Sequence, residues 1–301
     1  MIEKIYIVSH RYDLLNLSVC IGSILYWCPE IKIEIIVNEN NGKFSFFKPN
    51  NSNILLNSRF SNVIGTFYGS IIPFIEEDGC AVILDSDTAI LSSLHFLELK
   101  NSCDIIVDFE IQQNQSKVKD LYFDVDKLNQ RFDFLRKNNF TFNNGIISFN
   151  GSKFSIEDFN EHFVKDDFFS LRLKDSSGLK CHDQSLINLV VNYKSHKKEI
   201  NVSRNKFMIY PPESNLNEDL LFSNLLNKIP FEKVIHWADT KGAKPKPFKN
   251  ISNFYFNFFR SNLSFKNRII FKLFLNYISA EKKIKSLYTN GKTYIYKFSQ
   301  R

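Results

Sequence analysis

Two carboxylates separated by one residue, Asp85 and Asp87, directly follow an apolar stretch at residues 80–84. In an extended chain the side chains at positions i and i+2 point the same way, so both acids can face one ligand. At the carboxyl end of a parallel strand they would lie where open α/β sheets bind ligands. Oxygen ligands of this kind suit Mg²⁺ or Mn²⁺, which commonly bridge nucleotide phosphates. The pair predicts a divalent-metal site; the alternative is a solvated turn.

The elements that would position this pair alternate between strand-like and helix-like stretches. Helices are expected at residues 14–26, 71–77, 118–137, 156–169 and 183–193. Strands are expected at residues 5–8, 31–37, 63–67, 80–84, 102–109, 140–149 and 233–236. Such alternation predicts an α/β domain over residues 1–240, with a mostly parallel sheet and helices on both faces.

The composition is that of a globular protein. The 301 residues are 44% hydrophobic and 24% charged, which excludes a disordered chain, a collagen-like protein and a coiled-coil fibre. The cysteines are widely spaced and form no Cys-x-x-Cys pair, so they are expected to be reduced core thiols in a reducing cytosol. They are Cys20, Cys28, Cys80, Cys103 and Cys181. The N-terminus lacks the features of a signal peptide, and no apolar run reaches the roughly 18 residues of a membrane span.

The net charge of +7 is concentrated in the C-terminal extension, residues 241–301, which holds 14 Lys and Arg residues against one acid, Glu281. Phe254, Phe258 and Phe265 interleave there with basic residues at near-helical spacing. This composition predicts helices that dock on an anionic membrane surface, placing the protein peripherally on the cytoplasmic face of the cell membrane. The alternative is a helix packed on the core with a solvated basic face. Nucleic-acid binding is not expected, because no recognition motif accompanies the charge.

Four segments, in order, carry a family resemblance. They are residues 82–87, ending in Asp-x-Asp; 143–150, Asn-Asn-Gly-Ile-Ile-Ser-Phe-Asn; 182–188, His-Asp-Gln-Ser-Leu-Ile-Asn; and Val-Ile-His at 234–236 with Lys-Pro at 244–245. Together they resemble the nucleotide-sugar glycosyltransferases with the GT-A fold, a Rossmann-like α/β fold. The resemblance is closest to the retaining family 8 type, which includes bacterial lipopolysaccharide glucosyl- and galactosyltransferases.

The resemblance implies roles for residues at a metal and diphosphate site. Asp85, Asp87 and His236 would hold the divalent ion that bridges the diphosphate of a nucleotide sugar. An imidazole beside two carboxylates suits Mn²⁺, with Mg²⁺ as the alternative. Lys244 would contact the diphosphate, and Gly242 would let the backbone approach it closely.

The resemblance also implies contacts to the sugar and the base. Asn144, Asp183 and Gln184 match positions that cradle the transferred sugar; the alternatives are a turn at Asn144 and a helix N-cap at Asp183. Gln184 would position the sugar or act as a weak nucleophile, and Asp183 is the candidate base if the reaction inverts. In the loop after the first strand, Tyr12 would stack on a uracil ring and Asp13 would accept from its imide.

Several positions depart from the family pattern. The segment from His236 to Lys244 is two residues longer than usual, Asp239 replaces a Gly, and Lys246 replaces a Trp. These changes predict a reshaped diphosphate loop. Ser185 replaces the second acid of the Asp-Gln-Asp segment, which affects contacts to the sugar hydroxyls.

The expected function is metal-dependent transfer of a hexose from a nucleotide diphosphate sugar, a UDP-hexose in the family, to a glycan or lipid-linked glycan acceptor. The product would belong to lipopolysaccharide, capsule or a related surface glycan, and the resemblance implies retention of configuration. Two alternatives stay open: a non-catalytic nucleotide-sugar-binding module and a sugar-phosphate nucleotidyltransferase. The second usually has a Gly-rich basic loop after the first strand, and residues 9–13 have none.

Overall fold

A computed structural model of the chain describes residues 2–37, 48–50, 53–58, 69–100, 102–109, 122–128, 132, 140–160, 178–211, 215–237 and 248–299. The strand expected at 63–67, and most of the helices expected at 118–137 and 156–169, lie outside these residues. The described part is built on a seven-stranded sheet with the order β3-β2-β1-β4-β7-β6-β8. Strand β7 is antiparallel to both of its neighbours, and the other pairings are parallel. The predicted α/β fold with a mostly parallel sheet is confirmed.

The main sheet consists of β1 (Lys4–Ser9), β2 (Lys32–Val37), β3 (Ile54–Asn57), β4 (Cys80–Asp85), β6 (Ile105–Asp108), β7 (Ile146–Asn150) and β8 (Val202–Asn205). A small second sheet has the order β5-β10-β9 and consists of β5 (Thr88–Ile90), β9 (Met208–Ile209) and β10 (Val234–His236). The described helices are α1 (Leu14–Trp27), α2 (Ile72–Glu76), α4 (Val125–Leu128), α5 (Glu157–Asn160), α6 (His182–His196), α7 (Glu218–Leu226), α8 (Lys249–Ser261) and α9 (Phe265–Ser299).

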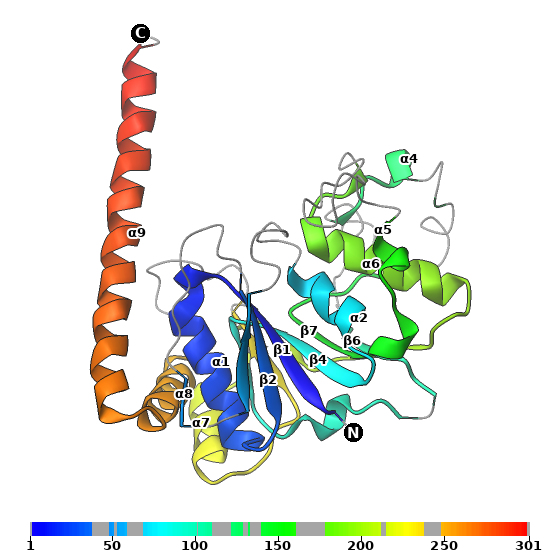
Figure 1. Ribbon diagram of the computed structural model, residues 1–301, viewed down its shortest axis with the longest axis horizontal. Coiled ribbons are helices and arrows are strands. Elements are labelled where there is room, and N and C mark those ends of the chain that lie inside the picture. Colours follow the sequence, from blue (N-terminus) through cyan, green and yellow to red (C-terminus); the bar gives the residue numbers. More distant parts are fainter. Residues whose placement is uncertain are drawn as a thin grey trace.

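Helices cover both faces of the main sheet (Figure 1). Because successive side chains of a strand point to opposite faces, Ile5 and Ile7 of β1 pack in the core that contains α1, whereas Tyr6 packs in the core that contains α2 and α6. In β4, Val82 joins the first core and Ile83 the second. A strand buried on both faces is apolar throughout rather than alternating, which explains the unbroken apolar run before Asp85.

Helix α1 is buried between the sheet and α8. Its Gly22 lies where α8 crosses, and a Cβ added at Gly22 would lie only 2.2 Å from the carbonyl oxygen of Tyr255. In α8 itself, Tyr255 and Phe259 are fully buried. The first helix of the basic extension therefore packs in the same core as the strands that precede it in the chain.

This packing bears on the expectation about the extension. Phe254 and Phe258 are partly buried, and both rings pack edge-on against Tyr26 of α1, with centroid distances of 5.3 and 5.2 Å. Helix α8 thus packs on the core, and the membrane docking expected of the extension stays a prediction. Phe265, at the start of α9, is 78% exposed.

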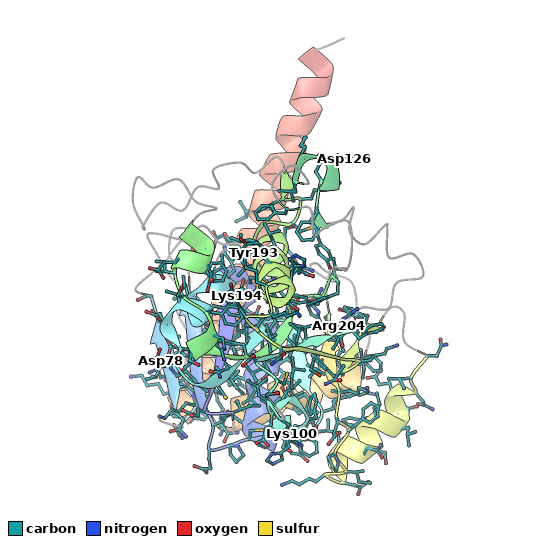
Figure 2. All side chains as sticks on the ribbon, turned by 90° about the vertical axis from the view of Figure 1, so that its right-hand side faces the viewer. Asp78, Lys100, Asp126, Tyr193, Lys194 and Arg204 are labelled. Atoms are coloured by element: carbon teal, nitrogen blue, oxygen red, sulfur yellow. The ribbon has the colours of Figure 1, made fainter. Side chains whose placement is uncertain are left out.

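The segment before β7 is held by α6 rather than by a strand. Asn188 accepts from the backbone N–H of Phe142 and donates to its carbonyl, and Asn192 does the same with Phe140. The strand expected at 140–149 therefore begins only at Ile146, because two side chains, one helical turn apart, take the place of a neighbouring strand. In Figure 2, the labels of Tyr193 and Lys194 mark helix α6 on the side of the molecule that faces the viewer.

Helix α9 runs along the side of the molecule that carries α1 and α8, and its C-terminal end projects beyond the body (Figure 1). Its inner face contributes Phe271 and Ile278 to the core shared with α1. Among the helices that the structure describes, none is both long and apolar enough to cross a membrane.

Candidate metal and sugar-nucleotide site

The pairing of two short strands brings His236 to the two aspartates. Asp85 ends β4 at the carboxyl edge of the main sheet, and the chain turns there into β5. Strand β10 pairs antiparallel with β5, with His236 opposite Thr88. The next residue, Trp237, donates its backbone N–H to the Asp87 carbonyl at 3.0 Å. This register places an imidazole beside carboxylates that lie about 150 residues earlier in the chain.

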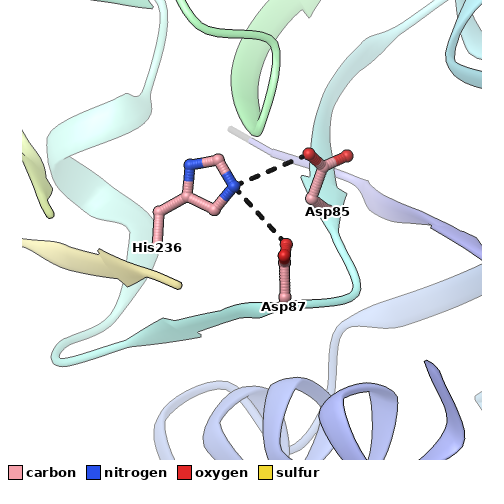
Figure 3. A group of neighbouring side chains, drawn as sticks. All are labelled: Asp85, Asp87 and His236. Atoms are coloured by element: carbon pink, nitrogen blue, oxygen red, sulfur yellow. Dashed lines mark ion pairs between the residues drawn. The ribbon is translucent and has the colours of Figure 1, made fainter. Parts of the chain in front are cut away.

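The three side chains face one another (Figure 3). The His236 Nε2 lies 3.4 Å from Asp87 Oδ1 and 3.7 Å from Asp85 Oδ2. One ligand atom from each of the three residues fits within 4.8 Å of the others. The exposed fractions of the side chains differ: 3% for His236, 13% for Asp87 and 41% for Asp85. The group is therefore closed on the His236 side and open at Asp85.

The two carboxylates determine the electrostatics of the imidazole. Burial alone would lower the pKa of His236, but the hydrogen bond and charge of Asp87, together with the charges of Asp85 and Asp108, raise it above its ordinary value. The imidazole thus takes up a proton more readily than a free histidine, because its surroundings are strongly negative. A site of this character favours a cation.

The residues present fit a divalent ion. Two ligands that are each about 2.1 Å from an ion and at right angles lie about 3.0 Å apart, so the observed nitrogen–oxygen separations need only a small closing movement. Carboxylate oxygens with an imidazole nitrogen match Mn²⁺ better than Mg²⁺, which prefers oxygen alone. The structure thus brings Asp85, Asp87 and His236 together as a possible site, and these three residues would hold the ion.

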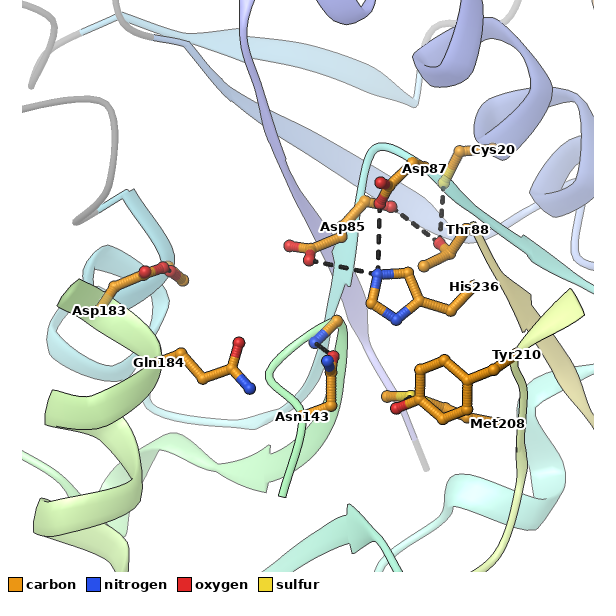
Figure 4. A network of polar contacts seen from close by, with 12 residues as sticks. Cys20, Asp85, Asp87, Thr88, Asn143, Asp183, Gln184, Met208, Tyr210 and His236 are labelled. Atoms are coloured by element: carbon orange, nitrogen blue, oxygen red, sulfur yellow. Dashed lines mark hydrogen bonds and ion pairs between the residues drawn. The ribbon is translucent and has the colours of Figure 1, made fainter. Parts of the chain in front are cut away.

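The first turn of α6 brings the predicted sugar-binding residues to the same edge of the sheet. Gln184 donates from Nε2 to the Tyr122 hydroxyl at 2.6 Å, and Asp183 accepts from the Ser70 hydroxyl. Figure 4 shows the Gln184 carboxamide pointing toward the side of the site that carries Asn143 and Asp85. Asp183 is not the N-cap, because the helix begins one residue earlier and its N-cap is Cys181.

Ser185, which stands where the family pattern has an acid, is bonded to the backbone. It is fully buried, accepts from the backbone N–H of Cys181 and donates to the carbonyl of Tyr122. A hydroxyl committed to two backbone groups is not available to a sugar, so Ser185 does not replace the acid of the family pattern in function.

Asn143 and Asn144 have different hydrogen-bond partners. Asn144 is 5% exposed and its Oδ1 accepts weakly from Asn188 at 3.5 Å, while its Nδ2 has no hydrogen-bond partner among the described residues. Asn143 is half-buried, accepts from the N–H of Gly145 at 2.7 Å, and stands between Gln184 and His236 in the view of Figure 4. The predicted sugar contact of Asn144 stays a prediction. Sequence reasoning missed Asn143, although its place two residues before Gly145 was visible in the motif.

The loop after β1 carries Tyr12 and Asp13 to the same edge, since Val8 of β1 lies in register with Asp85. The Tyr12 hydroxyl donates to Glu281 of α9 at 2.7 Å. The predicted contacts of these two residues with a nucleotide base stay predictions. Gly242 and Lys244, predicted at the diphosphate, lie outside the described residues.

The fold is similar to that of solved glycosyltransferases. The apo structure of WbbM, a bifunctional glycosyltransferase, matches with a TM-score of 0.51 and 17% identity, over 88% of this chain and 50% of that one. This chain thus spans half the length of the WbbM chain. The galactosyltransferase LgtC, in complex with donor and acceptor sugar analogues, matches with a TM-score of 0.52 and 15% identity, over 87% and 96%. No family model and no curated protein matches the sequence. The likeness shows the GT-A fold.

Proposed function

We propose that this GT-A-fold protein is a metal-dependent glycosyltransferase that moves a hexose from a nucleotide diphosphate sugar to a glycan acceptor. The observation that carries the proposal is the convergence of Asp85, Asp87 and His236 at the carboxyl edge of the sheet, within reach of one ion. Open α/β sheets bind ligands at this edge. A UDP-hexose is the proposed donor, and the proposed acceptor is a glycan or lipid-linked glycan of lipopolysaccharide, capsule or a related surface polymer.

The proposed reaction requires the protein to stabilise two opposite charges that develop in the transition state. Cleavage of the anomeric bond develops positive charge on the sugar ring and negative charge on the departing diphosphate. A bound divalent ion would supply Lewis-acid stabilisation of that negative charge. Asp85 and Asp87 hold their carboxylates toward His236, so this part of the site is prepared for a cation before any donor arrives.

The opposite side of the site would hold the sugar. There Gln184 presents a neutral carboxamide, fixed by Tyr122, while the carboxylate of Asp183 is bonded to Ser70. A carboxamide can orient a ring hydroxyl or the anomeric carbon but cannot remove a proton as a general base. This arrangement favours the retaining reaction that the family resemblance implies, in which the acceptor attacks on the face that the diphosphate leaves.

Nucleotide release from a panel of UDP-, GDP- and CMP-sugars tests the proposal, because slow donor hydrolysis needs no acceptor. We expect release from one donor with Mn²⁺, loss of that release in EDTA, and loss in Asp87→Asn. Asp78→Asn, which removes an exposed acid before β4, is the matched control and should behave as wild type. Release that is indifferent to EDTA would contradict the metal site. Donor binding without release in any condition would instead indicate a non-catalytic module.

We further propose that α9 docks the protein on the cytoplasmic face of an anionic membrane. Its outer face carries a stripe of exposed apolar side chains at a spacing of four residues, Phe265, Ile269, Leu273 and Tyr277. The exposed basic residues Lys266, Arg268, Lys272 and Lys283 lie on the same helix. An apolar stripe flanked by cations matches the boundary between lipid chains and anionic headgroups.

Co-sedimentation with vesicles of phosphatidylcholine, alone or mixed with phosphatidylglycerol, tests this docking. We expect binding to the mixed vesicles only, weakened by salt because exposed charges are screened. Leu273→Asp should abolish it, whereas Leu220→Asp, at an equally exposed leucine of α7, should not. Equal losses in both variants would contradict docking through α9.

A further inference from the structure

Gly145 lies between two of the three residues of the metal site. Its carbonyl accepts from the backbone N–H of Asp85 at 2.9 Å, which connects the turn before β7 to the end of β4. Its own N–H donates to the Asn143 side chain at 2.7 Å, which fixes the turn. The backbone of Gly145 is thus held in place from both sides, independently of His236.

The His236 imidazole rests directly on this backbone. A Cβ added at Gly145 would lie 2.5 Å from Cε1 and 2.8 Å from Nδ1 of the ring. Both distances are shorter than real carbon contacts, and the Cβ would also lie 2.9 Å from Asn143 Oδ1, so a side chain at position 145 would have to displace the imidazole, the Asn143 carboxamide or both. The Tyr210 ring lies on another side of the imidazole, with the centroids 5.8 Å apart and the planes tilted by 47°. The two neighbours leave the ring little freedom to move.

This packing matters because the second ring nitrogen is not anchored by a hydrogen bond. Histidines that bind metals usually donate their other N–H to a carboxylate or carbonyl, which fixes the orientation of the ring. In the part of the chain that the structure describes, the buried Nδ1 of His236 has no hydrogen-bond partner. The packing of Gly145 and Tyr210 against the ring therefore has to fix the orientation that a hydrogen bond fixes at other sites.

We propose that Gly145 is a positioning residue. Because it has no side chain, the His236 ring can pack directly against its backbone, and this contact orients Nε2 toward Asp85 and Asp87. This inference rests on one part of the proposed function, the binding of a divalent ion by Asp85, Asp87 and His236. Loss of an orienting partner at a metal-binding histidine typically weakens metal affinity by about 10 to 100-fold. A side chain at position 145 should have an effect of that size.

Mn²⁺ affinity, measured by titration calorimetry, tests this role in a double-mutant cycle. We expect Gly145→Ala to weaken binding by about tenfold or more. In the His236→Ala background the same change should have no further effect, because the displaced ring is absent. Gly79→Ala is the matched control, since the atoms nearest to a Cβ there belong to the flexible carboxylate of Glu3, the first at 3.2 Å. Thermal unfolding in EDTA reports whether each variant is folded.

The possible outcomes separate this inference from the proposed function. Wild-type affinity in Gly145→Ala, or an equal loss with and without His236, would overturn the positioning role while the metal site stands. No Mn²⁺ binding by the wild type would overturn both. If Gly145→Ala does not fold, Tyr210→Ala makes the same test from the other neighbour: it should weaken binding, and Tyr210→Phe should restore it. Unchanged affinity in Tyr210→Ala would then overturn the inference.

Discussion

Asp87 is the more enclosed of the two site carboxylates and the closer to His236, at 3.4 Å. We expect Asp87→Asn to weaken Mn²⁺ binding by about 100-fold, because a direct ligand is lost rather than one of its outer partners. The fold should survive, since the amide is nearly isosteric. Calorimetric titration of Mn²⁺ measures the effect, and the thermal midpoint in EDTA provides the control. Tight Mn²⁺ binding in this variant would exclude Asp87 as a ligand.

The raised pKa of His236 predicts how metal affinity depends on pH. In the metal-free protein the protonated imidazole stabilises the fold below its ordinary pKa of 6.5, and this stabilisation is lost as the pH rises through the higher folded-state value. Metal binding needs the neutral ring. Mn²⁺ affinity should therefore increase with pH through a window that lies above 6.5. In His236→Ala this increase should disappear; the same pH profile in both proteins would contradict the assignment of His236 as a ligand.

The three residues of the possible metal site could be predicted from the sequence, but the contacts that hold them in place could not. Asp85, Asp87 and His236 stand in motifs with readable spacing, whereas the role of Gly145 depends on a steric contact with a ring 91 positions later in the chain. Tyr210 and Ser70 act through similar contacts between elements distant in sequence. Spacing along a chain carries no information about such contacts, so these residues became visible only in the structure.

At the scale of elements, the long buried strands and helices were predicted best. Strands β1 and β4 contain continuous apolar runs, and β2 is rich in isoleucine and valine apart from Lys32 and Glu34; the positions of all three agree with expectation within a residue or two. Strand β8, with the sequence Val-Ser-Arg-Asn, has no apolar run, and β9 is only two residues long; both were missed. Their pairing partners determine their conformation, and partners cannot be read from so short a stretch.

The crossing of α1 and α8 is specified by one glycine. Alanine usually stabilises a helix interior by about 1 kcal/mol relative to glycine, but at Gly22 its Cβ would meet the Tyr255 carbonyl. We therefore expect Gly22→Ala to destabilise the protein by about 1–3 kcal/mol, the range found for overpacked cores. Chemical denaturation measures the change. Unchanged or increased stability would mean that α8 does not pack against α1 at Gly22 as described.

At the scale of the whole molecule, the two helices of the basic extension have different environments. Helix α8 completes the core, whereas α9 presents an apolar stripe to the outside and contacts the loop after β1 through Glu281 and Tyr12. Glu281 is the sole acid of residues 241–301, and it lies opposite the tyrosine predicted to stack on the base. The helix proposed to dock on a membrane is thus connected to the loop proposed to bind the nucleotide.

This connection predicts a measurable effect on nucleotide binding. Glu281→Ala removes one partner of the Tyr12 hydroxyl, and one hydrogen bond contributes about 0.5–1.5 kcal/mol. We expect the affinity for UDP in the presence of Mn²⁺ to fall by about two- to tenfold, measured by calorimetry. Lys283→Ala, two residues further along α9 and exposed, is the control. Equal affinities in wild type and Glu281→Ala would show that the nucleotide loop does not depend on α9.

The most direct test of the central claim is a crystal structure of the protein grown with Mn²⁺ and UDP, with anomalous data collected for manganese. We expect one anomalous peak within bonding distance of Asp85, Asp87 and His236, with the diphosphate of UDP on the same ion and the base near Tyr12 and Asp13. A nucleotide bound elsewhere, or bound at this edge of the sheet without an ion between the three side chains, would contradict the proposed metal-dependent transferase site.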